Sequence, residues 1–225
     1  KRRKLLASSL LLALDDEKSA KYRKDCQEKG LEIDYAKMNG MTHEKLFSFF
    51  YESKQLQRKN NGWEFDYVEN DFFGTKLDYD LVDSKSGKVL AKYGEKFNSL
   101  TAKNIKKESI KKLFVDDESI EGKYLSKDIF DPNSGIIYFE AGDEITKNVI
   151  SFLNEKKINN IDILNINSDK QGTYIRDTFF ADKNKNRNDA ITEIYKILRP
   201  GEPPTIDIAT QIFNNLFFSS DRYDL

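Results

Sequence analysis

Cysteine and histidine are almost absent from this chain, and each absence excludes a class of protein. The single cysteine, Cys26, excludes an internal disulfide and suits a reducing compartment. The single histidine, His43, excludes zinc sites of the usual cysteine and histidine kind, and any histidine-based triad would depend on it. The sequence also lacks a glycine-rich phosphate loop, a nucleophile elbow and a metal triad, so its own residues indicate no catalytic machinery.

Net charge and long apolar runs are lacking too. The formal net charge is −1, so any contact with DNA must come from local patches rather than from a global field. The apolar run Leu5–Leu14 is too short to cross a bilayer. It follows the basic residues 1–4, as in a secretory signal, but no small-residue cleavage site comes after it. We therefore interpret it as a short buried helix with a basic lead-in, and a secretory signal is the alternative.

The residues that are present indicate a folded protein. A length of 225 residues allows one or two domains with a sizeable core, and an aromatic content of 12% argues against disorder. The chain begins at Lys1 without a methionine and stops at Leu225 after a charged turn, from which we expect a piece of a longer protein.

Helices are predicted towards both ends of the chain. Residues 17–29 are charged and predict a solvated helix that ends at Gly30. Thr42 can cap a helix that is apolar on more than one side, so we expect burial of its large residues, Leu46, Phe47, Phe49 and Phe50. Near the C-terminus, Asn188 or Asp189 can cap one amphipathic helix and Thr205 can cap another.

The stretch from Trp63 to about Asn167 reads instead as short strands and turns, and it contains a repeat. Residues 74–87 match residues 122–135 at an offset of 48, and a third, partial copy begins at Gly172. Each full copy predicts the order strand, strand, threonine-capped helix, strand. A unit of this size buries its own apolar face poorly, so we expect the two copies to pack on each other.

Three local patterns each have a functional and a structural interpretation. Residues 182–193 place oxygen ligands as in a calcium loop, but Arg187 stands where that loop needs glycine, which favours a polar turn leading into a helix. The lysines between Lys103 and Lys112 suit a solvated helix face better than a nucleic-acid patch. Aromatic residues such as Trp63 could stack on bases, but in a strand-rich stretch they are usually core.

The strings that carry a family resemblance lie near the two ends. Arg199-Pro-Gly-Glu-Pro-Pro-Thr205 is rigid and charged and separates two amphipathic helices. Together with residues 172–178, residues 216–225 and the segment Arg2–Leu14, it resembles the lobe region of the bacterial DNA-directed RNA polymerase β subunit. The middle of the chain is similar to the insertion that many of these subunits carry inside the lobe.

The resemblance implies an α+β fold in which a mostly helical lobe, built from both chain ends, is interrupted by a strand-rich insertion with a duplicated β-β-α-β unit. We expect residues 1–56 and 168–225 to form the lobe, with 15–41 as a lineage-specific addition, and 57–167 to form the insertion.

The same resemblance implies a role rather than an activity. The lobe walls the channel for downstream DNA and helps to hold the non-template strand, and Asp224 is the candidate contact to an unpaired base. Arg2, Arg3 and Arg222 are further candidates for DNA contacts, although a solvated helix start is the other interpretation of the basic leader. We expect no catalytic residue and no cofactor in this piece, since the Mg²⁺ of the full enzyme is bound by another subunit.

The implied partners are the β′, α and ω subunits, a sigma factor, and downstream and non-template DNA, in the bacterial cytoplasm at the nucleoid. Transcription regulators could dock on the insertion, and no membrane is involved. The alternative function is a free-standing protein-interaction module built on the duplicated unit.

Overall fold

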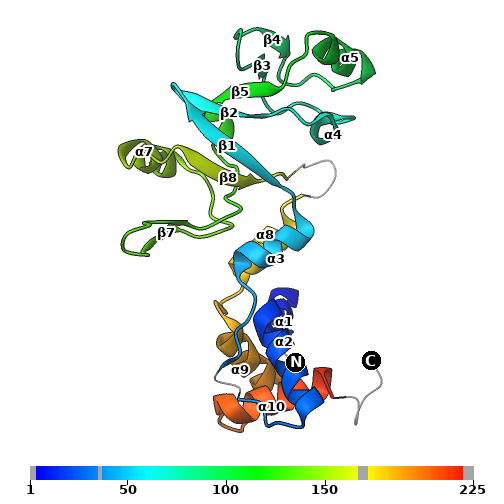
Figure 1. The fold of residues 1–225 in the computed structure, drawn as a ribbon, viewed down its shortest axis with the longest axis vertical. Helices are drawn as coiled ribbons and strands as arrows, with labels where there is room; N and C mark the ends of the chain where they lie inside the picture. The colour runs from blue at the N-terminus through cyan, green and yellow to red at the C-terminus, as the bar shows by residue number, and fades with distance from the viewer. Residues whose placement is uncertain (1–3, 35–36, 167–171, 220–225) are drawn as a thin grey trace. The chain divides into compact units, whose positions relative to one another are not determined.

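The computed structural model describes residues 4–34, 37–166 and 172–219 and divides the chain into two compact units (Figure 1). Unit 1 contains residues 1–46 and 174–225, and unit 2 contains residues 47–173. The mixture of helices and strands confirms the α+β class. The boundaries of the compact units fall at 46/47 and 173/174, whereas the sequence placed its division at 56/57 and 167/168.

The described part of unit 1 is helical. It contains α1 (Ala7–Ala13), α2 (Glu17–Lys29), α8 (Tyr174–Ala181), α9 (Arg187–Leu198) and α10 (Ile206–Phe217), together with the start of α3 (His43–Phe50). Helix α1 packs against α8 and α9, and α9 packs against α10. Segments from opposite ends of the sequence therefore share one core. Its buried residues include Leu12, Phe179, Ile191 and Phe213.

Helix α1 is short and largely buried, with Ser8, Ser9, Leu12 and Ala13 on its buried side. This agrees with the interpretation of the apolar run as part of a folded core. Within residues 4–34, 37–166 and 172–219, no helix has the length and apolar character to span a membrane.

Some helix ends of unit 1 follow local chemistry that is visible in the sequence. Thr205 stands at the N-cap of α10 as predicted, but its side chain makes no capping hydrogen bond. Asp16 accepts a hydrogen bond from the Ser19 amide at 2.7 Å and starts α2, and Gly30 ends it with a left-handed φ of 63°. The predicted cap of α9 was wrong by two or three residues. Asn186 has extended backbone angles and its side chain accepts from the Asp189 amide at 3.0 Å, so the helix begins earlier.

Helix α3 corrects another prediction. Leu46 and Phe47 are buried, but Phe49 is 62% exposed and Phe50 is only half-buried. Two helical residues separated by one position lie about 200° apart around the axis, so Phe49 is directed away from the face that Phe47 buries. The backbone of Lys45 does bond the Thr42 hydroxyl at 3.2 Å, as expected of a cap.

Unit 2 is built around a six-stranded antiparallel sheet with the strand order β4-β3-β5-β2-β1-β8. Its strands are β1 (Ser53–Lys59), β2 (Gly62–Asp66), β3 (Leu81–Asp83), β4 (Val89–Ala91), β5 (Lys112–Asp116) and β8 (Asn160–Leu164). A separate two-stranded sheet pairs β6 (Ile129–Phe130) with β7 (Ile137–Phe139). The helices are α4 (Glu69–Phe72), α5 (Ser99–Lys107), α6 (Asp117–Ile120) and α7 (Lys147–Glu155).

Strand structure begins at Ser53, well before the predicted start at Trp63. Strand β1 is mostly polar and fully buries only Leu56, so it lacks the alternation of apolar and polar residues that identifies a strand in a sequence. It is held in place by pairing with β2 on one side and β8 on the other. Tertiary pairing, rather than local preference, makes this segment a strand.

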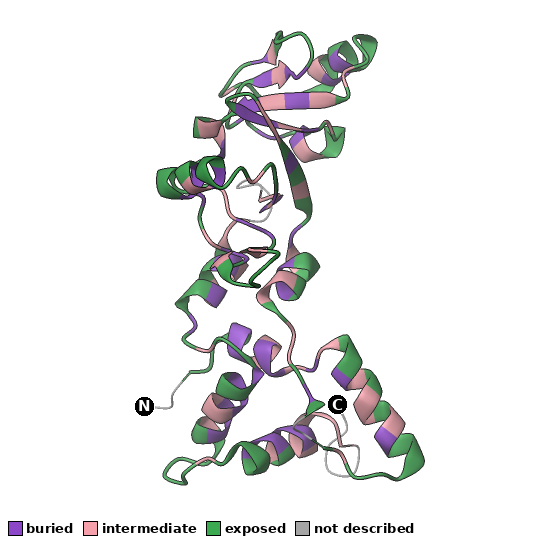
Figure 2. Cartoon of the chain, turned by 60° about the vertical axis from the view of Figure 1, so that its left-hand side comes forward, coloured by how far each residue is buried: buried purple, intermediate pink, exposed green. Residues whose placement is uncertain are grey.

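Elements of the same kind recur in unit 2 at the offset of the sequence repeat. The pairs are α4 with α6, β3 with β6, β4 with β7, α5 with α7 and β5 with β8. Unusual backbone angles recur as well, because Gly74 and Gly122 have φ of 81° and 79°, and Ser109 and Lys157 both have φ of 54°. One hydrophobic cluster contains residues from both halves (buried residues in Figure 2).

The halves also differ from each other and from the expectation. Strand β3 joins the large sheet through β5, whereas β6 pairs only with β7 among the described strands. Helix α7 is capped by Thr146 as predicted, but α5 is capped by Asn98 instead of Thr101. The expected third copy is wrong, because the residues that follow Gly172 form helix α8.

Candidate functional site

The four residues proposed from the sequence to contact DNA are Arg2, Arg3, Arg222 and Asp224, and all four lie outside the described residues. Their roles therefore stay predictions. Three polar arrangements within the described residues are the other candidates for function, two in unit 2 and one in unit 1.

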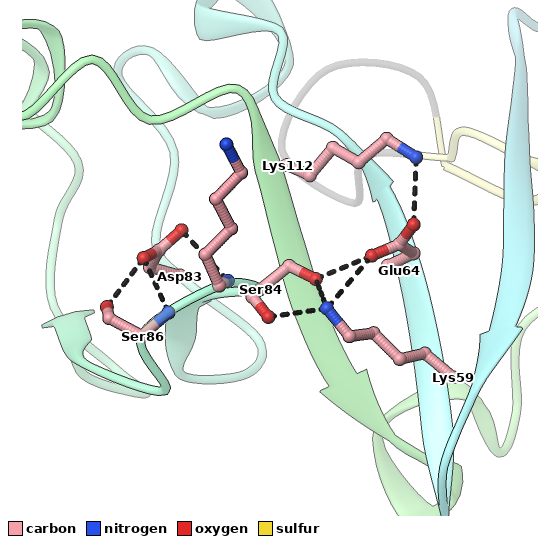
Figure 3. A network of polar contacts seen from close by, with 7 residues as sticks. Lys59, Glu64, Asp83, Ser84, Ser86 and Lys112 are labelled. Atoms are coloured by element: carbon pink, nitrogen blue, oxygen red, sulfur yellow. Dashed lines mark hydrogen bonds and ion pairs between the residues drawn. The ribbon is translucent and has the colours of Figure 1, made fainter.

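The first arrangement is a network around Glu64 on strand β2 (Figure 3). One carboxylate oxygen, Oε1, accepts from Lys112 Nζ of β5 at 2.8 Å. The other, Oε2, accepts from Ser84 Oγ at 2.7 Å and from Lys59 Nζ at 3.2 Å. Lys59 also bonds the carbonyl of Ser84 at 2.6 Å, so the network joins β1, β2 and β5 to the residue that follows β3.

The electrostatics of this network favour a fixed negative charge. The hydrogen bond from Lys112, followed by that from Ser84, lowers the pKa of Glu64 from 4.5 to about 2, although burial acts in the opposite direction. Hydrogen bonding to Glu64 in turn raises the pKa of Lys112. Because both carboxylate oxygens are engaged and the group stays ionised, Glu64 suits a structural link between strands and not proton transfer.

The turn beside this network has a counterpart in the second half of unit 2. Asp83 accepts from the Ser86 amide at 2.9 Å and from its hydroxyl at 2.5 Å, and these bonds lower the pKa of Asp83 (Figure 3). Asp131, at the matching position of the repeat, accepts from the Asn133 amide and the Ser134 hydroxyl, both at 2.9 Å. The same turn chemistry therefore shapes both hairpins.

The second arrangement is a cleft of about 270 Å³ within unit 2. Lys54 Nζ lies 2.9 Å from the carboxylate of Asp71, and Lys123 forms an ion pair with Asp78. Each of these lysines is matched by a carboxylate, so the four side chains are neutral as a set. Burial raises the pKa of the Tyr79 hydroxyl, which also lines the cleft, and keeps it protonated.

The third arrangement is a buried ion cluster in unit 1. The Asp15 carboxylate lies 2.9 Å from Arg23 and 3.0 Å from Arg187, and the side chains of Asp15 and Arg187 are 1% and 4% exposed. The Arg23 guanidinium also lies 3.6 Å from the ring centre of Phe218. This cluster connects the loop after α1, helix α2 and the first residue of α9, so it holds the two ends of the sequence together.

The loop predicted to resemble a calcium site is organised in another way. Asp182 accepts hydrogen bonds from the hydroxyls of Ser8 at 2.5 Å and Ser9 at 2.7 Å, and from the Asn184 amide at 2.9 Å. Burial alone would raise the pKa of Asp182, but these hydrogen bonds hold it below the usual value. Arg187 lies in the first turn of α9, so the loop is a polar turn leading into a helix.

Within the ranges that the structure describes, no three histidine, cysteine, aspartate or glutamate side chains are grouped closely enough to hold a metal ion. No local signal in the sequence indicated the ion cluster, because Asp15 and Arg187 are far apart in the chain.

Comparison with known proteins finds bacterial relatives of this chain. No family model matches it. The chain is 40% identical over 187 residues to the DNA-directed RNA polymerase subunit β of Rickettsia conorii, and the same identity and length are found for Rickettsia felis and Rickettsia akari. The match covers 83% of this chain and 14% of each relative.

The class of protein is therefore a segment of a much larger bacterial subunit, since the chain spans about one seventh of the relatives it matches. In particular, the chain is similar to RNA polymerase β subunits and corresponds to a fragment of β, which confirms the predicted resemblance.

Proposed function

We propose that this chain is the lobe of an RNA polymerase β subunit and that it walls the downstream DNA channel during transcription. In this proposal unit 1 is the lobe, and unit 2 is an insertion that arose by duplication of a β-β-α-β unit. The observation that carries the proposal is the joining of both chain ends in one helical unit, in a chain similar to β over 83% of its length.

The alternative, a free-standing interaction module built on unit 2, has less support. The match to β subunits is 187 residues long, whereas unit 2 runs only from 47 to 173, so the similarity includes residues of unit 1. The recurrence of elements within unit 2 supports duplication inside a β subunit equally well.

The role of the lobe is architectural in this proposal. The chain supplies no catalytic residue and no cofactor, and the Mg²⁺ of the assembled enzyme is held by another subunit. The partners are the β′, α and ω subunits, a sigma factor, and downstream and non-template DNA, in the cytoplasm at the nucleoid. Regulators dock on unit 2, and Arg2, Arg3, Arg222 and Asp224 contact DNA.

A test uses polymerase assembled with the full β subunit that contains this segment. In the test variant, residues 199–205 are replaced by a glycine and serine linker of the same length. In the control variant, residues 131–135, in the turn between β6 and β7, are replaced by such a linker of their own length. We expect the first change to shorten the lifetime of promoter complexes challenged with a competitor. Nucleotide addition on a preformed RNA–DNA scaffold should be unchanged for both.

Loss of nucleotide addition on the scaffold would assign the segment a catalytic role and contradict the proposal. Equal lifetimes of promoter complexes for the linker variant and the wild type would contradict the proposal that the segment walls the DNA channel. The isolated chain should incorporate no nucleotide, and incorporation by the pure chain would also overturn the proposal.

A further inference from the structure

The two halves of unit 2 have similar elements but opposite charge. Residues 85–112 contain nine lysines and two glutamates, Glu95 and Glu108, for a net charge of +7. Residues 133–160, the matching part of the second half, contain three lysines and four acidic residues, for a net charge of −1. Eight of the nine lysines are exposed and Lys112 is half-buried. We call the eight exposed lysines of residues 85–111 the basic face.

Position by position, the second half replaces every one of these lysines. Three of them lie on helix α5, at Lys103, Lys106 and Lys107. The matching positions of α7 hold Ser151, Asn154 and Glu155. Lys92 and Lys96 correspond to Glu140 and Glu144. Because the second half forms the same order of elements without these lysines, the fold does not require them.

Contacts place much of the basic face in one region of the first half. Ala102 and Ile105 form the buried side of α5, and the three α5 lysines are exposed. Lys88 Nζ lies 2.6 Å from Glu108, which brings the hairpin turn to the C-terminal end of α5. The Ser84 amide donates to the carbonyl of Lys112 at 3.1 Å. Lys85, which follows Ser84, and Lys111, which precedes Lys112, are therefore neighbours as well.

A role in stabilising helix α5 explains only part of the positive charge of the basic face. Lys106 and Lys107 lie in the last turn of α5, where a positive charge stabilises the helix end. Helix α7 has no basic residue in its last turn and forms all the same. Lys103 lies in the middle of α5, and the other five lysines lie on the hairpin, on the turn before α5 and on the segment before β5, where the helix dipole has little effect.

We propose that the basic face of unit 2 binds the phosphodiester backbone of nucleic acid. Lysines are point charges that contact phosphates without reading sequence, and releasing counterions drives such binding. With a net charge of only −1 on the whole chain, a local patch of this kind is what a nucleic-acid contact requires. The choice of nucleic acid over an acidic protein rests on the proposed function, which places the segment beside DNA.

The structure supplies both the variant and its control. The variant changes α5 to the residues of α7, as Lys103→Ser, Lys106→Asn and Lys107→Glu. The control makes the same three kinds of change at exposed lysines of the second half, as Lys147→Ser, Lys157→Asn and Lys156→Glu. Asparagine is placed at 157 because it tolerates the left-handed backbone there, where φ is 54°. Both triple variants lose the same charge.

The measurement is fluorescence anisotropy of the 225-residue chain with labelled duplex DNA and, separately, with single-stranded RNA of the same length, across a salt series. Each phosphate contact contributes about one to the slope of log affinity against log salt, so the α5 variant should lower that slope by about 2 to 3. Its affinity at low salt should fall by at least about tenfold, and the control should bind like the wild type. The probe that shows the larger loss identifies the nucleic acid.

Equal losses in the α5 variant and in the control, or no loss in either, would overturn the proposal. Displacement of both probes by polyglutamate at an equal concentration of charge would overturn it too, because the face would then fit an acidic polypeptide. A circular dichroism spectrum matching the wild type shows that the variants are folded. These outcomes leave the channel-wall proposal untouched, since that proposal is tested by promoter complexes of the assembled polymerase.

Discussion

Replacing Glu64 with glutamine tests the network at the centre of the large sheet. The pKa of Glu64 falls from 4.5 to about 2 in the folded chain, mainly through hydrogen bonds from Lys112 and Ser84. That difference corresponds to about 3 kcal/mol of stability at neutral pH if it acts in full. The two lysines that pair with Glu64, Lys59 and Lys112, are 35% and 41% exposed, so solvent screens part of the interaction. We therefore expect Glu64→Gln to lower the free energy of unfolding by about 1–2 kcal/mol.

The pH dependence gives the prediction its sign. The folded state has the lower pKa, so this contribution is present above about pH 4.5, the unfolded value, and is lost as the pH falls towards about 2. The stability gap between the wild type and Glu64→Gln should accordingly be constant near neutral pH and close in acid. Urea unfolding can be followed by the fluorescence of Trp63, the single tryptophan of the chain, which is fully buried in unit 2.

Glu108→Gln is the matched control. Glu108 pairs with Lys88 at 2.6 Å, but its side chain is 41% exposed, and we expect a change within about 0.5 kcal/mol. The reasoning would be refuted by equal unfolding free energies for the two variants at neutral pH. A gap between the wild type and Glu64→Gln that persists unchanged in acid would refute it as well.

Three further predictions concern Gly142 in unit 2, Asp15 in unit 1 and the loop before α9. Gly142→Ala should lower the free energy of unfolding, followed by Trp63 fluorescence, by roughly 3 kcal/mol, because φ is 92° and the new Cβ would lie 2.7 Å from the Phe47 ring. Gly135→Ala, at φ of 70° with open space around the new Cβ, should lower it by only about 1 kcal/mol. Equal losses for the two variants would contradict this reasoning. Asp15→Asn leaves two arginines of unit 1 without their buried countercharge and should lower the free energy of unfolding, followed by circular dichroism, by about 3 kcal/mol. Glu28→Gln on the surface should change it little. Similar melting curves for the two variants would argue against the ion cluster. Calcium should produce no binding heat, since the loop before α9 uses its first carboxylate for internal hydrogen bonds, and a saturable heat would count against that assignment.

Local signals in the sequence sufficed where a few neighbouring residues fix the backbone. The start and end of α2 follow from Asp16 and Gly30, because a side-chain cap and a left-handed glycine act within one turn. The same holds for the repeat in unit 2, which the glycines of the two hairpins mark. The family resemblance also came from short strings, and the comparison with β subunits confirms it.

Other features could not be predicted because they depend on tertiary packing. Strand β1 is polar and is a strand because β2 and β8 pair with it. Packing of α3 buries the side of the helix that carries Leu46 and Phe47 and leaves Phe49 exposed, and the apolar residues of the helix alone did not indicate which side that is. The charge difference between the halves of unit 2 was visible in the sequence, but its meaning depends on matching each lysine to its structural counterpart.

The sequence by itself thus determined the class of fold, the main helices, the recurrence within the strand-rich part and the relationship to β subunits. Only the tertiary structure decided that Asp15 meets Arg23 and Arg187, that Asp182 receives the hydroxyls of Ser8 and Ser9, and that Glu64 is shared by two lysines. The physical reason is that caps and turns depend on neighbours in the chain, whereas buried charges depend on partners brought close by folding.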